Sequence, residues 1–100
     1  MLLSKSNYII ILDIKKNNIK IIDYYYYYAK IIKLGKKETR FLMLLSDNEL
    51  KTTEEILNFM NYSQANIAIM IKRIFNKTGI IIHNRKKYGY TLEQEILINY

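Results

Sequence analysis

The stretch from Ile56 to Leu92 carries six lysines or arginines and no acid, although the whole chain has nine acids. Three of the six cations stand together in Arg85-Lys86-Lys87. Phosphates attract lysine and arginine and repel carboxylates, so a long acid-free segment is typical of a surface that binds nucleic acid. The alternative is that acids are scarce here by chance in a chain rich in Lys and Ile. The bias toward Ile, Lys, Asn and Tyr indicates an AT-rich genome, so some of these patterns could reflect codon bias.

A helix from Ser63 to Thr78 is predicted to carry part of this charge. One side would face the core through residues at helical spacing, namely Ile67, Met70, Ile71 and Ile74. The other side mixes cations, amides and small or apolar groups, namely Ala65, Asn66, Ile69, Lys72, Arg73 and Asn76. Such a mixture suits the DNA major groove, where Arg and Lys pair with guanine or phosphate, Asn pairs with adenine, and apolar groups meet thymine methyls. A plain solvent-facing side is the alternative, but it would more often include glutamate.

The segments on either side of this helix predict how it is held. Thr52 with Glu55 three residues later has the spacing of a capping box, which starts a second helix shortly before the third. Two helices with a short turn between them form a helix-turn-helix. After Gly79, residues 80–82 and 89–92 predict the strands of a hairpin with a basic turn at 83–88. Its tip cations could reach a neighbouring groove or phosphate, or could simply be solvated.

The N-terminal third predicts a small sheet. Residues 8–14, 19–23 and 30–34 are rich in isoleucine and predict strands, and the asparagines within 15–18 suit a tight turn. Gly35 ends this pattern, and an apolar helical stripe begins in the helix that starts at Lys36. The predicted fold is therefore α+β and forms one domain over residues 1–100. It has an antiparallel sheet at 8–34, three helices at 36–78, a hairpin at 80–92, and a tail at 93–100 that could form one helical turn.

Five consecutive tyrosines, Tyr24, Tyr25, Tyr26, Tyr27 and Tyr28, follow the second predicted strand. As a strand they would alternate between two faces, with Tyr24, Tyr26 and Tyr28 on one of them. They would then form a half-buried aromatic cover at a strand end. The alternative is an exposed surface for dimerisation or for a protein partner.

Several classes of function have little support. The chain has no cysteine and one histidine, His83, so it offers no thiolate metal site, and no catalytic or metal-ligating constellation stands out. Its three glycines make no phosphate-cradling loop. No apolar run is long enough to span a bilayer, and the N-terminus lacks the pattern of a signal peptide. We expect a cytoplasmic protein that is not an enzyme, uses no cofactor or metal and has no membrane partner.

The order of these elements resembles the winged-helix DNA-binding domain of response regulators of the OmpR/PhoB type, over about Tyr8 to Leu92. The family's Leu-Thr-x-x-Glu-x-x-Leu-Leu opening of its first helix is similar to the segment from Leu34 to Leu42. Its Arg-Gly-x-Gly-Tyr-x-Leu wing ending is similar to Lys86-Lys87-Tyr88-Gly89-Tyr90-Thr91-Leu92. The resemblance implies a winged helix-turn-helix, here as a stand-alone domain without a receiver, from a bacterium or a bacterial mobile element.

The resemblance also implies roles for residues of the third helix. Lys72 and Arg73 match basic recognition-helix positions that touch DNA in the family, and Asn66 matches a small polar position at the helix start. Ala65 and Phe75 depart from the pattern, because the family often has arginine there. Affinity is therefore expected to persist while base readout differs.

In the hairpin, Lys86 matches the wing arginine that enters or skirts the minor groove, and Tyr90 matches the wing tyrosine. Asn84 stands where a wing threonine often contacts phosphate, and Lys87 replaces the first wing glycine. The connection between the second and third helices is several residues shorter than in the family, where it can touch RNA polymerase. A repressor or co-regulator is therefore favoured over an activator of that kind.

The hypothesis that follows is a sequence-specific regulator of transcription that binds double-stranded DNA as a homodimer or in tandem on repeated half-sites, and that is associated with the nucleoid. A protein-interaction adaptor that uses the tyrosine run is the first alternative, and single-stranded nucleic acid stacked on tyrosine is another. The predicted DNA-binding residues are Asn66, Ile69, Lys72, Arg73, Asn76, Asn84, Arg85, Lys86, Lys87 and Tyr90.

Overall fold

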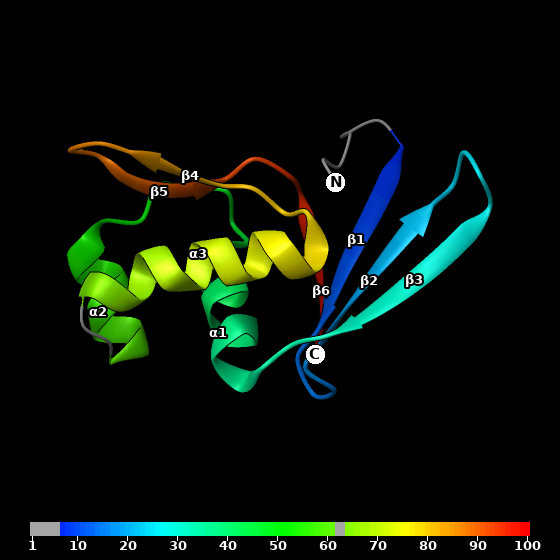
Figure 1. Cartoon of the computed structure of the whole chain (residues 1–100), viewed down its shortest axis with the longest axis horizontal. Coiled ribbons are helices and arrows are strands. Elements are labelled where there is room, and N and C mark those ends of the chain that lie inside the picture. The colour runs from blue at the N-terminus through cyan, green and yellow to red at the C-terminus, as the bar shows by residue number, and fades with distance from the viewer. Residues whose placement is uncertain (1–6, 62–63) are drawn as a thin grey trace.

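A four-stranded sheet and a two-stranded hairpin flank three helices in the computed structural model, which describes residues 7–61 and 64–100 (Figure 1). The elements in chain order are β1 (Tyr8–Asp13), β2 (Asn18–Asp23), β3 (Tyr28–Lys33), α1 (Lys36–Leu45), α2 (Thr53–Met60), α3 (Gln64–Thr78), β4 (Ile82–Arg85), β5 (Gly89–Leu92) and β6 (Ile96–Asn99). The α+β class predicted from the sequence is confirmed.

The first three strands form the predicted antiparallel meander. Their inner face buries alternate apolar side chains, as in Ile10 and Leu12 of β1. Asn17 turns the chain between β1 and β2 with a positive φ of 50°, which asparagine tolerates better than most residues.

The C-terminal segment does not form a helical turn, so that prediction is wrong. Residues 96–99 instead form β6, which pairs with β1 in parallel and gives the sheet the order β3-β2-β1-β6. The sheet is therefore mixed rather than antiparallel throughout. Ile96 is buried and Ile98 half-buried on the inner face, because alternate apolar residues suit a strand beside the open edge of β1.

The tyrosine run does not continue a strand, so the predicted alternation between two faces is wrong. Residues 24–27 make the turn between β2 and β3. The buried carboxylate of Asp23 holds this turn, since its Oδ1 accepts hydrogen bonds from the backbone N–H of Tyr25 at 3.0 Å and of Tyr26 at 3.1 Å. All five tyrosines are exposed, from 47% for Tyr24 to 93% for Tyr27, so they are not a half-buried cover.

The helices begin and end near the predicted positions. The Thr52 hydroxyl accepts from the N–H of Glu55 and the Glu55 carboxylate accepts from the N–H of Thr52, both at 3.1 Å, which confirms the capping box. Gly79 ends α3 with a φ of 79°. The predicted Ser63 cap lies outside the described residues.

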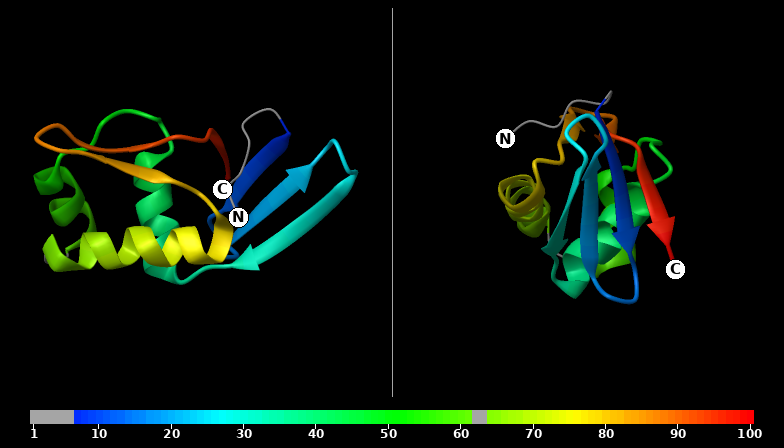
Figure 2. Two further views of the ribbon diagram at one scale, coloured as in Figure 1. Left: turned by 45° about the horizontal axis from the view of Figure 1, so that its top comes forward. Right: turned by 90° about the vertical axis from the view of Figure 1, so that its right-hand side faces the viewer.

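One core runs from the inner face of the sheet to the base of the hairpin. Its largest fully buried side chains include Leu12, Ile19, Phe41, Leu42, Leu45, Ile56, Ile67, Ile74 and Ile80. The helices cover only one face of the sheet, and they lie behind it in the right-hand view of Figure 2. The hairpin and the N-terminal half of α3 lie at the opposite end of the molecule from β3 (Figures 1 and 2).

Candidate nucleic-acid interface

Helix α3 has two different sides, as its sequence predicted. Ile67, Met70 and Ile74 are at most 4% exposed and pack into the core. Ile71 is only half-buried, so the core stripe is narrower than predicted. The predicted DNA-facing residues that the structure describes are all exposed, namely Asn66, Ile69, Lys72, Arg73 and Asn76. The side chain of residue 65 is outside the description.

The hairpin begins later than predicted. Strand β4 spans Ile82–Arg85 rather than residues 80–82, so His83, Asn84 and Arg85 belong to a strand and the turn is confined to residues 86–88. The N–H of Tyr88 donates to the carbonyl of Arg85 at 2.9 Å and closes this turn. Figure 1 and the left view of Figure 2 place the tip at the same end of the molecule as the start of α3.

The part of the hairpin next to its turn is held by the segment before α2. Lys51 and Tyr90 exchange two backbone hydrogen bonds, of 2.9 and 2.8 Å, so residue 51 forms a bridge to β5. The neighbouring Gly89 has a φ of 127°, and a Cβ added there would lie 2.2 Å from the carbonyl oxygen of Lys51. Only glycine allows this approach, which gives a physical reason for the glycine in the wing ending.

Lysine stands at the most strained position of the turn. Lys87 has a φ of 75°, a left-handed conformation that non-glycine residues rarely adopt. The resembled family has glycine at this position. The conformation holds an exposed cation at the hairpin tip, beside the exposed side chains of Arg85 and Lys86.

One of the six cations is not available to a phosphate. The ammonium of Lys77 lies 2.7 Å from Oε1 of Glu38 in α1, and that glutamate is only 3% exposed. Glu38 Oε1 also accepts from the N–H of Gly35 at 2.7 Å. Lys77 therefore serves to neutralise a buried carboxylate.

The other five cations remain exposed. Within the part of the chain that the structure describes, none of them forms an ion pair. These five are Lys72, Arg73, Arg85, Lys86 and Lys87. Glu93, in the bend between β5 and β6, lies with its Oε2 3.7 Å from Nε2 of His83.

Helix α1 extends the positive surface, which the sequence did not predict. Lys36 and Lys37, at the start of α1, line a hollow of about 290 Å³ together with Arg73 of α3 and the ion pair between Lys77 and Glu38. The adjacent lysines were visible in the sequence, but nothing local showed that the end of α3 packs beside the start of α1. The basic surface therefore reaches beyond the segment 56–92.

Two predicted hairpin residues differ in accessibility. Asn84 pairs with Tyr90 across the hairpin, and the register puts their side chains on one face. Asn84 is exposed, but Tyr90 is half-buried against the core and its backbone is bonded to Lys51. Its ring therefore supports the hairpin, and only its outer part can reach a ligand.

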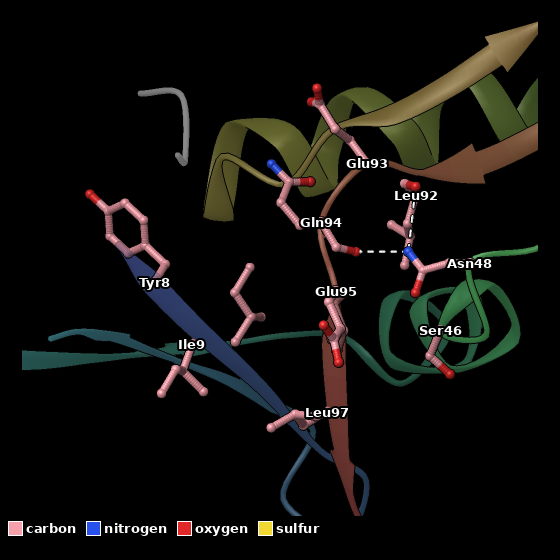
Figure 3. Close-up of a pocket in the computed structure, with 11 residues that line it drawn as sticks. Tyr8, Ile9, Ser46, Asn48, Leu92, Glu93, Gln94, Glu95 and Leu97 are labelled. Atoms are coloured by element: carbon pink, nitrogen blue, oxygen red, sulfur yellow. Dashed lines mark hydrogen bonds between the residues drawn. The ribbon is translucent and has the colours of Figure 1, made fainter. Parts of the chain in front are cut away.

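A larger cavity of about 620 Å³ lies between the start of β1, the end of α1 and the chain between β5 and β6 (Figure 3). The Gln94 carbonyl accepts from Nδ2 of Asn48 at 3.0 Å, and its side-chain Oε1 accepts from the N–H of Ile81 at 3.1 Å. These contacts fix the path from the hairpin into β6. Partial burial and the nearby Asp23 carboxylate raise the pKa of Tyr8, which also lines this cavity.

The cavity brings together no nucleophile with a hydrogen-bonded base among the residues described. In residues 7–61 and 64–100, no group of three His, Cys, Asp or Glu side chains could hold a metal ion. No helix in these ranges is long and apolar enough to cross a membrane. No family model matches this sequence, and no curated protein matches it either.

Proposed function

We propose that this protein is a sequence-specific regulator of transcription that binds double-stranded DNA through a winged helix-turn-helix. Helix α3 enters the major groove, and the β4–β5 hairpin is the wing that reaches an adjacent minor groove or the backbone. The observation that carries the proposal is the set of five exposed cations without ion pairs on α3 and the hairpin, in a segment that has no acid.

The exposed side chains of α3 and the packing of the hairpin support the same proposal. The exposed side of α3 combines Lys72 and Arg73 with two amides and the 53% exposed Ile69, groups that can read base edges and thymine methyls. The isolated bridge between Lys51 and Tyr90 ties the hairpin to the segment before α2 and supports the proposed wing. The arrangement of sheet, helices and hairpin is compatible with a winged helix.

A repressor or co-regulator fits the connection before the recognition helix. Only residues 61–63 separate α2 from α3. In the resembled family a longer loop at this place can contact RNA polymerase. In this proposal the protein regulates transcription by occupying its DNA site. It does so in the cytoplasm and without a cofactor.

The test is fluorescence anisotropy of the purified protein with random duplex DNA over a range of salt concentrations. Five or six phosphate contacts predict a log–log salt slope of roughly −4 to −5. Replacing Lys72 and Arg73 together by alanine removes about two contacts. Affinity should then fall by roughly 30-fold or more and the slope by about two.

The matched control is the double variant Lys15→Ala/Lys16→Ala. It removes the same charge from two exposed lysines in the turn between β1 and β2. This control should change affinity by less than about threefold, because non-contacting charges act only through a screened field. Equal losses in both double variants would show that binding follows net charge, and unchanged binding by the α3 variant would exclude the docking proposed.

The exposure of all five tyrosines favours a second candidate, a winged-helix adaptor that binds a protein through Tyr24–Tyr28. Absence of DNA binding at low salt would favour this adaptor. Its partner affinity should respond little to salt, because a tyrosine-centred contact releases few counterions.

A further inference from the structure

The outer face of the four-stranded sheet is largely apolar, and no helix or strand among residues 7–61 and 64–100 covers it. In the right-hand view of Figure 2 the strands face the viewer and all three helices lie behind them. An antiparallel sheet that is covered on one side only normally alternates apolar residues toward the core with polar residues toward water. Here both faces carry apolar side chains.

The register of the strands shows which residues share the outer face. Ile9 is opposite Ile22, which is opposite Ala29, and Leu97 is opposite Ile11 in the next row. Three of these large side chains are well exposed, with Ile9 at 40%, Leu97 at 50% and Ile31 at 65%. The outer sheet face is defined by Ile9, Ile11, Ile22, Ala29, Ile31 and Leu97.

One cation interrupts this surface without dividing it. Lys20 lies between Ile11 and Ile31 in the same row across the sheet. Its aliphatic stem can lie along the neighbouring isoleucines while its ammonium reaches water. The other charged residues of this face, Asp13 and Lys33, lie at the end of the strands away from the tyrosine turn.

The tyrosine turn enlarges the apolar surface at the other end. The four side chains of Tyr24–Tyr27 are 47–93% exposed, whereas Tyr28 stands opposite the buried Asp23 and is therefore on the inner face. With about 200 Å² for each tyrosine side chain, these four offer roughly 550 Å². A standard stable interface buries about 800 Å² on each partner, so the turn and the outer sheet face together reach that size.

We propose that the outer sheet face is the homodimer interface and that its occupant is the same face of a second copy. Two sheets pack face to face about 10 Å apart, and side chains from both faces then form a core. A second copy supplies a face of equal size, equal flatness and matching apolar character. Twofold dimers that pair one patch with itself are the most frequent oligomers.

The charge distribution favours the same occupant. The chain has a net charge of +7, so two copies repel each other over most of their surface. The hairpin with Arg85, Lys86 and Lys87 lies at the end of the molecule away from the sheet, and α3 with Lys72 and Arg73 lies on the other side of the sheet from its outer face (Figures 1 and 2). A dimer through the outer sheet face keeps these cations apart and leaves both basic surfaces open. The inference goes beyond the proposed function and does not depend on it.

The test is sedimentation velocity of the full chain over a concentration series, with and without Ile31→Glu. Two copies of the variant would bury a pair of carboxylates at the interface, which should weaken dimerisation by about 100-fold or more. Ile31 is 65% exposed, so the subunit should still fold. Leu97→Glu, at a 50% exposed position on β6, should have the same effect and guards against a local defect at β3.

The matched control is Ile69→Glu, which makes the same change at a 53% exposed isoleucine of α3. Its dimerisation should equal that of the unaltered chain. A chain that stays monomeric at all concentrations would overturn the proposal and leave the face to another occupant. A dimer that tolerates both sheet variants would overturn it as well, because another surface would then hold the subunits together.

DNA binding separates this inference from the proposed function. Ile31→Glu should lose affinity for a duplex with two half-sites but keep the salt-dependent binding of one subunit. The Lys72→Ala/Arg73→Ala variant should bind DNA roughly 30-fold more weakly and remain a dimer. Failure of one proposal therefore leaves the other open to measurement in the same samples.

Discussion

Substituting Gly89 by alanine should strongly destabilise the domain, because it disrupts the contact between the hairpin, next to its turn, and the segment before α2. A φ of 127° is nearly restricted to glycine, and holding alanine there costs about 1–3 kcal/mol. The new Cβ would also lie 2.2 Å from the Lys51 oxygen and 2.7 Å from its carbonyl carbon, so the segment before α2 must move away. That movement breaks the two backbone hydrogen bonds between Lys51 and Tyr90, at about 1 kcal/mol each.

The expected loss in the free energy of unfolding is therefore about 3–5 kcal/mol, a large share of the 5–15 kcal/mol typical of a domain. Urea denaturation followed by circular dichroism measures it, and a loss of this size would lower Tm by more than about 12 °C. Gly35→Ala is the matched control, because Gly35 has a φ of −73° and an added Cβ would meet only the Glu38 carboxyl at 3.5 Å or more.

Gly35→Ala should lower the free energy of unfolding by less than about 1 kcal/mol, which is the usual effect of changing an N-cap residue. If Gly89→Ala loses as little as Gly35→Ala, the close approach of residues 51 and 89 is wrong. If the proposed function is right, DNA affinity should fall in the Gly89 variant even at temperatures where it is folded, because the proposed wing is no longer held by the segment before α2.

Two further predictions concern ion pairs. Lys77→Met should lower the free energy of unfolding by about 3 kcal/mol, because it leaves the buried Glu38 carboxylate without its cation. Glu38→Gln should lower the free energy of unfolding by less than Lys77→Met does. The DNA affinity of the folded Lys77 variant should stay within about threefold of that of the unaltered chain, since this lysine is outside the proposed interface. The hydrogen bond from Lys51 lowers the pKa of Asp47 below its ordinary value near 3.8. This pair therefore stabilises the protein at neutral pH. Its contribution is lost as the pH falls below about 3.8 and through the folded-state pKa. Because Asp47 is half-exposed, Asp47→Asn should lower the free energy of unfolding by only about 0.5–1 kcal/mol at pH 7, measured by urea denaturation. The difference from the unaltered chain should shrink as the pH falls below about 3.8, and a difference that is independent of pH would contradict this role.

Local signals in the sequence predicted much of the fold. Helical periodicity, the Thr52–Glu55 capping box and the stop at Gly79 concern residues within a few positions of one another, so the three helices were predicted with nearly correct ends. The turn at Asn17 has a similar local cause. The two sides of α3 followed from the same periodicity.

The errors arose where a distant partner decides the structure. Residues 96–99 become a strand because β1 offers an open edge, and nothing in the tail alone shows this. Lys77 was counted with the other cations because its partner, Glu38, lies 39 positions away in the chain. The tyrosine turn differs, because its cause is local: Asp23 accepts two N–H groups, and that capping outweighs the preference of tyrosine for strands.

The parallel pairing of β6 with β1 has a consequence for the order of folding. Asn99 and Asp13 are hydrogen-bonded at 3.3 Å although they are 86 residues apart in sequence. Contacts of such long range form late and slow the search for the native topology. Until residues 96–99 dock, β1 has an unpaired edge next to an apolar face, which is a template for the wrong strand of another chain. Strand β6 therefore protects the edge of β1 from other strands. The newly made protein is most prone to aggregation before β6 has paired with β1.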